Sequence, residues 1–161
     1  MDEMDDSVLK PPFDPAVLVP AEALLFAPDG APALRGSRCT ACGEVYFPVA
    51  KGCSRCLAST MEDCNLGDRG TLWSWTVQGF LPKPPYNSGE TAATFQPYGV
   101  GYVEMASGIK IHTRLTTADP ARLRIGEPFT LVIAPYGTDP QGRPLLTFAF
   151  QPTDPKETGH A

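Results

Sequence analysis

The sequence predicts a mainly β protein that has a short N-terminal helix, a small cysteine-rich module and a five-stranded antiparallel barrel. Its 18 prolines and 15 glycines make up 33 of the 161 residues, about 20% against an ordinary sum near 12%. Prolines interrupt the hydrogen-bond ladder of long helices, whereas short strands joined by turns tolerate them. Two Cys-x2-Cys pairs lie close together, and five strand-like segments follow them. Among five-stranded barrels the OB-fold is the leading candidate.

Residues 1–34 are predicted to form an N-terminal arm with a short helix. The arm begins acidic and polar and ends its first part at Pro11-Pro12. The stretch Phe13 to Phe26 is apolar enough for a short helix, in which Pro20 either starts a second turn or breaks a longer helix. Residues 27–32 contain Asp-Gly and prolines, which is typical of a linker.

The cysteine pairs lie in residues 35–66, which we expect to form a zinc ribbon. Cys39 and Cys42 are separated from Cys53 and Cys56 by ten residues. Two thiolates three positions apart on a tight turn both reach one ion at about 2.3 Å, and two such turns complete a tetrahedron. Zinc is the default metal for four thiolates. Four thiolates leave no open position for water, so the predicted zinc is structural and not catalytic.

Two other interpretations compete with zinc. A pair of disulfides suits a secreted chain, and a thioredoxin-type redox motif needs one Cys-x2-Cys at a helix start, not two facing turns. The remaining thiol is Cys64, for which a nucleophilic role requires a nearby base. The two histidines are His112 and His160. We therefore expect Cys64 to be a packed residue.

Residues 67–152 are expected to form the barrel, and residues 153–161 a disordered polar tail. Alternation in the first strand places Trp73, Trp75 and Val77 on one face. Ser107-Gly108 predicts a hairpin turn, and residues 119–123 predict one helical turn. The expected strands cover residues 71–77, 98–105, 109–115, 129–136 and 145–151.

Charge and hydropathy restrict the partners. The net charge of −5 and the pI near 4.9 disfavour non-specific binding to a phosphate backbone. The sequence contains no run of 18 apolar residues, so no transmembrane helix is expected. The first six residues are acidic where a signal peptide is basic. We therefore expect a cytoplasmic protein that does not bind membranes.

Four blocks in order resemble the DUF35 family of acyl-CoA-associated zinc-ribbon and OB-fold proteins. The first block is the ribbon with its two cysteine pairs, and the resemblance spans roughly residues 34–151. Leu57 departs from the family pattern, in which a glycine is common at this position. The other three blocks are Gly70 to Val77, Pro97 to Glu104 and Leu123 to Phe129.

The resemblance implies an N-terminal helix, a rubredoxin-like zinc ribbon holding one structural zinc, and a C-terminal OB barrel. It also implies a non-catalytic accessory subunit of a thiolase-like enzyme that cleaves or forms a carbon–carbon bond on an acyl-CoA. Family roles include the benzoylsuccinyl-CoA thiolase and steroid side-chain aldolases. In these complexes the thiolase-like chain holds the catalytic residues, and the small chain supports assembly and the CoA channel.

Two segments are candidates for contact with CoA or with the partner. Strict alternation places Lys110, His112 and Arg114 on one strand face, where they suit a CoA phosphate or an acidic patch. A solvated outer face is the ordinary alternative. The loop from Phe80 to Gln96 is long enough to suggest a function. Its candidate contacts are Phe80, Lys83 and Tyr86, and a floppy insertion is the alternative.

Two further classes of function compete with the accessory subunit. Zinc ribbons and OB barrels also bind single-stranded nucleic acid, but such modules need basic grooves with stacking aromatics. A stand-alone enzyme would use Cys64 or His112. The sequence favours a subunit without catalytic residues of its own over both.

Overall fold

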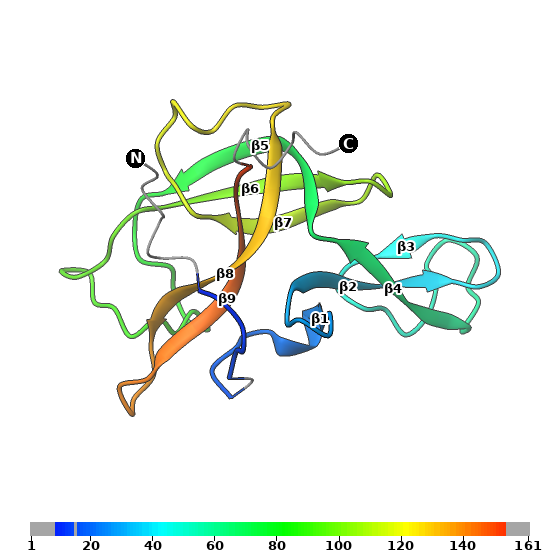
Figure 1. Cartoon of the computed structure of the whole chain (residues 1–161), viewed down its shortest axis with the longest axis horizontal. Helices are drawn as coiled ribbons and strands as arrows, with labels where there is room; N and C mark the ends of the chain where they lie inside the picture. The colour runs from blue at the N-terminus through cyan, green and yellow to red at the C-terminus, as the bar shows by residue number, and fades with distance from the viewer. Residues whose placement is uncertain (1–8, 15, 154–161) are drawn as a thin grey trace.

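The computed structural model describes residues 9–14 and 16–153, which form a four-stranded sheet and a closed five-stranded barrel (Figure 1). The tail expected to be disordered lies, from Asp154 on, outside these residues. No helix among the described residues has the length and apolarity needed to cross a bilayer. The elements are η1 (Ala21–Ala23), β1 (Leu24–Phe26), β2 (Pro32–Cys39), β3 (Val45–Tyr46), β4 (Met61–Gly67), β5 (Arg69–Gln78), β6 (Tyr98–Met105), β7 (Lys110–Leu115), β8 (Pro128–Thr138) and β9 (Pro144–Pro152).

The barrel has the strand order β5-β6-β7-β9-β8, and β8 closes it by pairing with β5. The order of first, second, third, fifth and fourth strand is that of an OB-fold, as predicted. Every pair is antiparallel except β7 with β9, which run parallel. All five strands were predicted, with ends that differ by at most two residues.

The core fills the barrel with side chains from all five strands. Leu72, Val103, Ile111, Phe129 and Phe150 are completely shielded from solvent. Each such side chain contributes about 1.5–3 kcal/mol by leaving water. The buried positions on β7 alternate with exposed ones, so Lys110 and His112 lie on the outer face as expected.

The N-terminal helix is present only as the single 3-10 turn η1. Pro20 precedes it in an extended conformation, with φ −86° and ψ 121°. The apolar residues that follow do not continue the helix, because Leu24–Phe26 pair with Pro32–Leu34 as a hairpin. Pairing with β2 satisfies the backbone groups that a longer helix would have satisfied internally. The helical turn expected at residues 119–123 is likewise an isolated turn.

A β-bulge in β5 overturns the expected alternation of its aromatic residues. The register with β6 shifts between Leu72 and Ser74, which leaves Trp73 unpaired. Two consecutive side chains at a bulge then point to the same side. Trp73 is 52% exposed, whereas Trp75 packs against the core. The two tryptophans therefore lie on opposite faces of the strand.

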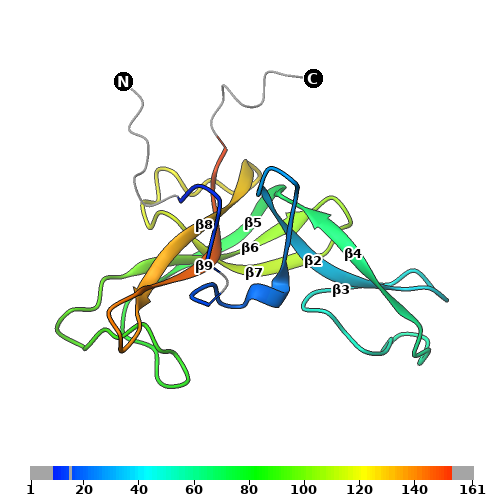
Figure 2. The same ribbon diagram turned by 60° about the horizontal axis from the view of Figure 1, so that its bottom comes forward.

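The N-terminal segment lies across the barrel and contacts β8 and β9 through isolated bridges (Figure 2). Leu18 pairs in parallel with Leu146 of β9. The Val19 N–H donates to the Leu146 carbonyl at 2.8 Å, and the Leu146 N–H donates to the Val17 carbonyl at 2.7 Å. Val17 and Leu18 are buried in the same hydrophobic cluster as the barrel core.

Candidate metal centre and partner-binding surface

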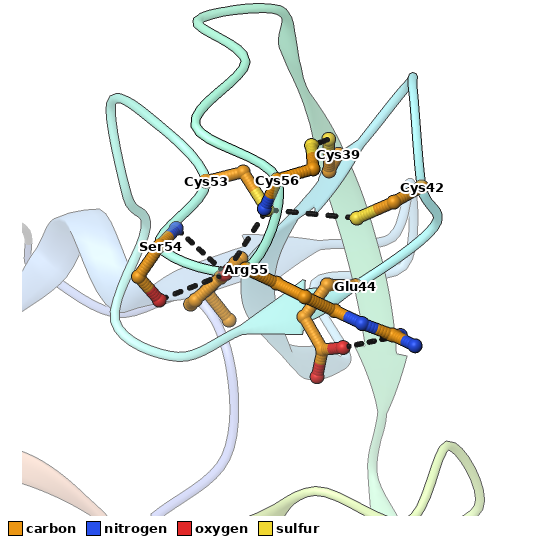
Figure 3. Close-up of polar contacts among 8 residues, drawn as sticks. Cys39, Cys42, Glu44, Cys53, Ser54, Arg55 and Cys56 are labelled. Atoms are coloured by element: carbon orange, nitrogen blue, oxygen red, sulfur yellow. Dashed lines mark hydrogen bonds and ion pairs between the residues drawn. The ribbon is translucent and has the colours of Figure 1, made fainter.

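The four-stranded sheet carries the cysteine pairs at the end that projects away from the barrel (Figures 1 and 3). The sulfurs of Cys39, Cys42, Cys53 and Cys56 all lie within 4.8 Å of one another. The Cys39–Cys56 and Cys42–Cys53 sulfur pairs are each 3.6 Å apart. Zn–S bonds of about 2.3 Å place the sulfurs of a tetrahedron about 3.8 Å apart. The four thiols therefore fit a tetrahedral thiolate-bound metal.

Each cysteine pair lies on a tight turn of the same design. The Gly43 N–H donates to the Cys39 carbonyl, and the Leu57 N–H donates to the Cys53 carbonyl, both at 2.9 Å. Gly43 has φ +81° and Leu57 has φ +65°. The left-handed region is open to glycine but costs a branched side chain about 1–2 kcal/mol. The second turn therefore keeps the geometry of the first in spite of its leucine.

Tyr46 of β3 supports the second cysteine pair. Its hydroxyl lies 3.2 Å from the Cys53 sulfur and 3.1 Å from the Ser54 hydroxyl. The Ser54 N–H donates to the same phenol oxygen at 3.0 Å, which leaves the phenol proton free for the sulfur. The Tyr46 hydrogen bond lowers the pKa of the Cys53 thiol to about 6. The Tyr46 contact therefore favours the thiolate form of this sulfur.

The four thiols differ in acidity. The Cys42 N–H lowers the pKa of Cys39. The Glu44 N–H lowers the pKa of Cys42, but desolvation and the other sulfurs raise it further, to about 12. Negative charge on two sulfurs thus disfavours charge on the others. A bound dication removes that repulsion, which is what a tetrathiolate metal site requires.

Polar contacts fix the ribbon loops to the sheet. The Ser37 hydroxyl is buried and accepts a hydrogen bond from the Ala50 N–H at 2.9 Å. Arg55 pairs with Glu44 at 3.0 Å across the two turns (Figure 3).

Cys64 lies on β4 opposite Gly36, half-buried against the core cluster. Its position agrees with a packed residue.

The long loop after β5 is fixed to the barrel through Tyr86. Its ring stacks with Tyr98 at 6.3 Å between ring centroids. The Arg114 guanidinium lies 3.7 Å from the Tyr98 ring centroid and donates to the Tyr86 hydroxyl at 3.2 Å. Desolvation raises the pKa of Tyr98 and of Tyr136, so both stay neutral phenols. The Arg114 guanidinium is therefore held by the side chains of Tyr98 and Tyr86.

The same loop also packs on the end of β8. The Thr138 N–H donates to the Ser88 carbonyl at 2.8 Å, and the Tyr136 hydroxyl donates to the Asn87 side chain at 3.1 Å. A Cβ on Gly137 would overlap the Ser88 carbonyl oxygen, so only glycine permits this approach. The segment around Ser88 is thus docked and does not behave as a floppy insertion.

A second aromatic and cationic group lies on the outer face of β5, β6 and β7. The Trp73 ring meets Tyr102 edge-to-face at 6.1 Å, and Tyr102 lies 5.3 Å from the His112 ring. The Lys110 ammonium lies 4.9 Å from the Trp73 ring centroid and 3.4 Å from a Glu104 oxygen. We call these residues (Trp73, Tyr102, Lys110 and His112) the outer-face cluster.

The residues predicted for partner or CoA contact therefore divide between two places. Tyr86 and Arg114 meet beneath the long loop, whereas Lys110 and His112 belong to the outer-face cluster. Phe80 is 73% exposed, and Lys83 is exposed in the same loop. Sequence reasoning missed Tyr98, Tyr102, Tyr136 and the outward position of Trp73. Tyr102 was detectable from its register opposite His112, but the bulge at Trp73 had no sequence signal.

The chain is thus a zinc-ribbon protein with an OB barrel. Residues 30–62 match the family model of the ChsH2 rubredoxin-like zinc ribbon domain, and residues 65–134 match that of the ChsH2 C-terminal OB-fold domain. The chain belongs to the DUF35 family, to which these ChsH2 domains and several relatives are assigned.

Its relatives are subunits and scaffolds. The benzoylsuccinyl-CoA thiolase subunit BbsA of Thauera aromatica is 30% identical over 144 residues, which covers 88% of this chain and 93% of that protein. A DUF35 domain-containing scaffold protein of Methanothermobacter thermautotrophicus is 28% identical, in an alignment that covers 62% of this chain and 70% of that protein. The solved Ltp2-ChsH2(DUF35) aldolase matches with a TM-score of 0.55 and 26% identity, covering 74% of this chain and 84% of that chain.

Proposed function

We propose that this protein is a non-catalytic accessory subunit of a thiolase-superfamily complex that acts on an acyl-CoA thioester. The observation that carries the proposal is the 30% identity to a benzoylsuccinyl-CoA thiolase subunit over nearly the whole of both chains. The similarity to a chain of a solved aldolase supports the same kind of role. The partner would carry out thiolytic or aldol-type carbon–carbon cleavage, and this chain would support assembly and the CoA channel.

In this proposal the ribbon holds one structural zinc through Cys39, Cys42, Cys53 and Cys56. The sulfur spacing fits a tetrahedral ion, and four thiolates occupy every position of a four-coordinate zinc. The metal would fold a region that has few apolar side chains of its own. One zinc per chain in the purified protein is the expected result of elemental analysis.

The outer-face cluster is the proposed contact with the partner. Trp73 and Tyr102 are 52% and 41% exposed, although both are large aromatic side chains. Tryptophan, tyrosine and arginine dominate the binding energy of protein interfaces. Phe80 and Lys83 extend from the loop that Tyr86 and Arg114 anchor, and they are proposed to border the CoA entrance of the partner.

Co-purification tests the proposal. Tagged chain expressed with a thiolase-like protein of the same organism should yield a stable heteromer that cleaves the acyl-CoA, whereas this chain alone should give no turnover. The double variant Trp73→Ala/Tyr102→Ala should weaken the complex at least about tenfold. Ile125→Ala is the matched control, because Ile125 is 66% exposed but lies in the turn before β8. Separate elution of the two wild-type chains would refute the subunit role.

A second function is favoured by one observation. Three residues of the outer-face cluster (Tyr102, Lys110 and His112) lie on the second and third barrel strands, which form the face that binds oligonucleotides in many OB-folds. A net charge of −5 opposes this function. A gel shift with single-stranded DNA and RNA at low salt separates the two, because an accessory subunit should give no retarded band.

A further inference from the structure

The barrel is closed between β7 and β9 by a short stretch of strand pairing. These strands pair only at Arg114 with Ala149 and at Leu115 with Phe150. Toward the start of β7 the two strands diverge, and a cleft of about 600 Å³ opens between them and the zinc ribbon. Its apolar walls include Phe47 and Pro48 from the ribbon and Phe148 from β9. Its polar lining includes His112, Glu22 and Arg35. Ribbon and barrel thus contribute to one groove.

β7 pairs with β6 on one side, but the edge of β7 that faces this groove is unpaired at Lys110 and His112. The Met105 N–H donates to the Ile109 carbonyl at 2.9 Å, which fixes the phase of the β6–β7 ladder. Hydrogen-bonded and non-hydrogen-bonded pairs alternate in an antiparallel ladder. Ile111 and Thr113 therefore bond to β6, whereas Lys110 and His112 direct their N–H and C=O groups toward the groove. Within residues 9–14 and 16–153, no hydrogen bond satisfies these groups.

The N-terminal segment of the chain itself occupies the part of this gap that lies beside Leu146 of β9. Val17 to Val19 lie along β9 and exchange two backbone hydrogen bonds with Leu146. Pro20, which has no N–H, follows directly, and the chain then passes along the wall of the cleft through Glu22. An extended segment therefore already docks here by strand pairing, and it stops short of β7.

We propose that the free edge at Lys110 and His112 accepts an extended segment of the thiolase-like partner as an added β-strand. Such strand addition gains affinity from backbone hydrogen bonds and specificity from side-chain pockets. The cleft would take an apolar side chain of that segment against Phe47 and Phe148, whose rings meet edge-to-face with 6.0 Å between their centroids and form one apolar wall. This inference rests on the proposed function, since it names where the same partner binds.

Charge indicates the chemistry of the added segment. Lys110 and His112 project along this edge on the outer face, and Arg35 and Arg114 line the cleft, in a protein whose net charge is −5. The acidic groups nearby are Glu104, which pairs with Lys110, and Glu22 on the cleft wall. A carboxylate on the partner segment would complement the cations. The site is therefore suited to a short strand that combines one apolar and one acidic residue.

Amide hydrogen exchange of the full chain, alone and in the purified complex, tests the added strand directly. In the free chain the Lys110 and His112 amides should exchange rapidly, while those of Ile111 and Thr113 are protected by β6. In the complex we expect the His112 amide to exchange at least tenfold more slowly. Unchanged rapid exchange at Lys110 and His112 in a stable complex would overturn the proposal and leave the subunit role intact.

Two variants at one position separate backbone from side chain. His112→Pro removes the N–H that faces the groove but no hydrogen bond to β6, as proline on a free edge allows. His112→Ala removes only the imidazole. We expect His112→Pro to weaken partner binding at least tenfold more than His112→Ala in calorimetric titration. Equal losses in the two variants would refute strand addition, and failure of the wild-type chain to bind would refute the proposed function itself.

Discussion

The two cysteine turns of the ribbon provide a matched test of backbone strain at Leu57. Leu57 holds φ +65° and is 86% exposed, so replacing it removes no packing. A left-handed conformation costs a non-glycine residue about 1–2 kcal/mol. Glycine loses about 0.5–1 kcal/mol more backbone entropy on folding, which offsets part of the relief. Leu57→Gly should therefore stabilise the turn by about 0.5–1 kcal/mol.

The gain should appear in metal affinity, because binding and folding of a zinc module are coupled. Since 1.4 kcal/mol is tenfold in affinity, Leu57→Gly should tighten zinc binding about two- to fivefold. Competition with a chromogenic chelator measures this change. Gly43→Ala should have the opposite effect: Gly43 has φ +81°, and a Cβ there would meet no atom within 4 Å, so only the dihedral opposes it.

A control separates the dihedral from the general effect of glycine. Ser59 is exposed two residues beyond Leu57 and lacks a positive φ, so Ser59→Gly should not tighten zinc binding. Weaker zinc binding in Leu57→Gly, or an unchanged affinity in Gly43→Ala, would refute the strain argument. If Leu57→Gly and Gly43→Ala changed zinc affinity in the same direction, the positive φ that the two turns share would not control that affinity.

Three further predictions concern the ribbon and the loop. Tyr46→Phe removes the hydrogen bond that lowers the pKa of Cys53, so protons compete better for the sulfur. Zinc affinity should therefore fall about tenfold. In a pH titration, the release of zinc by acid should move to higher pH. An unshifted release curve would contradict this role. Removal of zinc by a chelator should expose Lys51 and Arg55 to trypsin while the barrel fragment persists on a gel, and equal resistance with and without zinc would contradict a structural metal. Gly137→Ala should destabilise the protein by about 1–3 kcal/mol in urea unfolding, because its Cβ would overlap the Ser88 carbonyl; wild-type stability would show that the loop is not docked there.

Local patterns predicted most of the barrel. Alternation on β7 separates the buried Ile111 and Thr113 from the exposed Lys110 and His112 because successive side chains of a strand point to opposite faces. The two cysteine pairs predicted a tetrathiolate arrangement because thiolate spacing on tight turns is a short-range constraint. Both signals depend only on neighbouring residues.

Failures occurred where distant segments compete for the same backbone. The apolar run before Ala27 suited a helix, yet pairing with Pro32–Leu34 gives Leu24–Phe26 long-range hydrogen bonds in a strand. The outward turn of Trp73 depends on how β5 matches β6, since a bulge is a property of two strands together. No periodicity within either segment encodes it.

By itself, the sequence determined the grouping of the four ribbon cysteines, the five barrel strands and the buried face of β7, because spacing and alternation act over a few residues. Only the tertiary structure decided which surface the barrel presents. It brought Tyr86 to Arg114, turned Trp73 outward toward Lys110, and left the edge of β7 at His112 unpaired beside the ribbon. These features arise where chain segments far apart in sequence meet. The free energy of such contacts depends on loop closure and on the register between strands, and neither is determined by one segment alone.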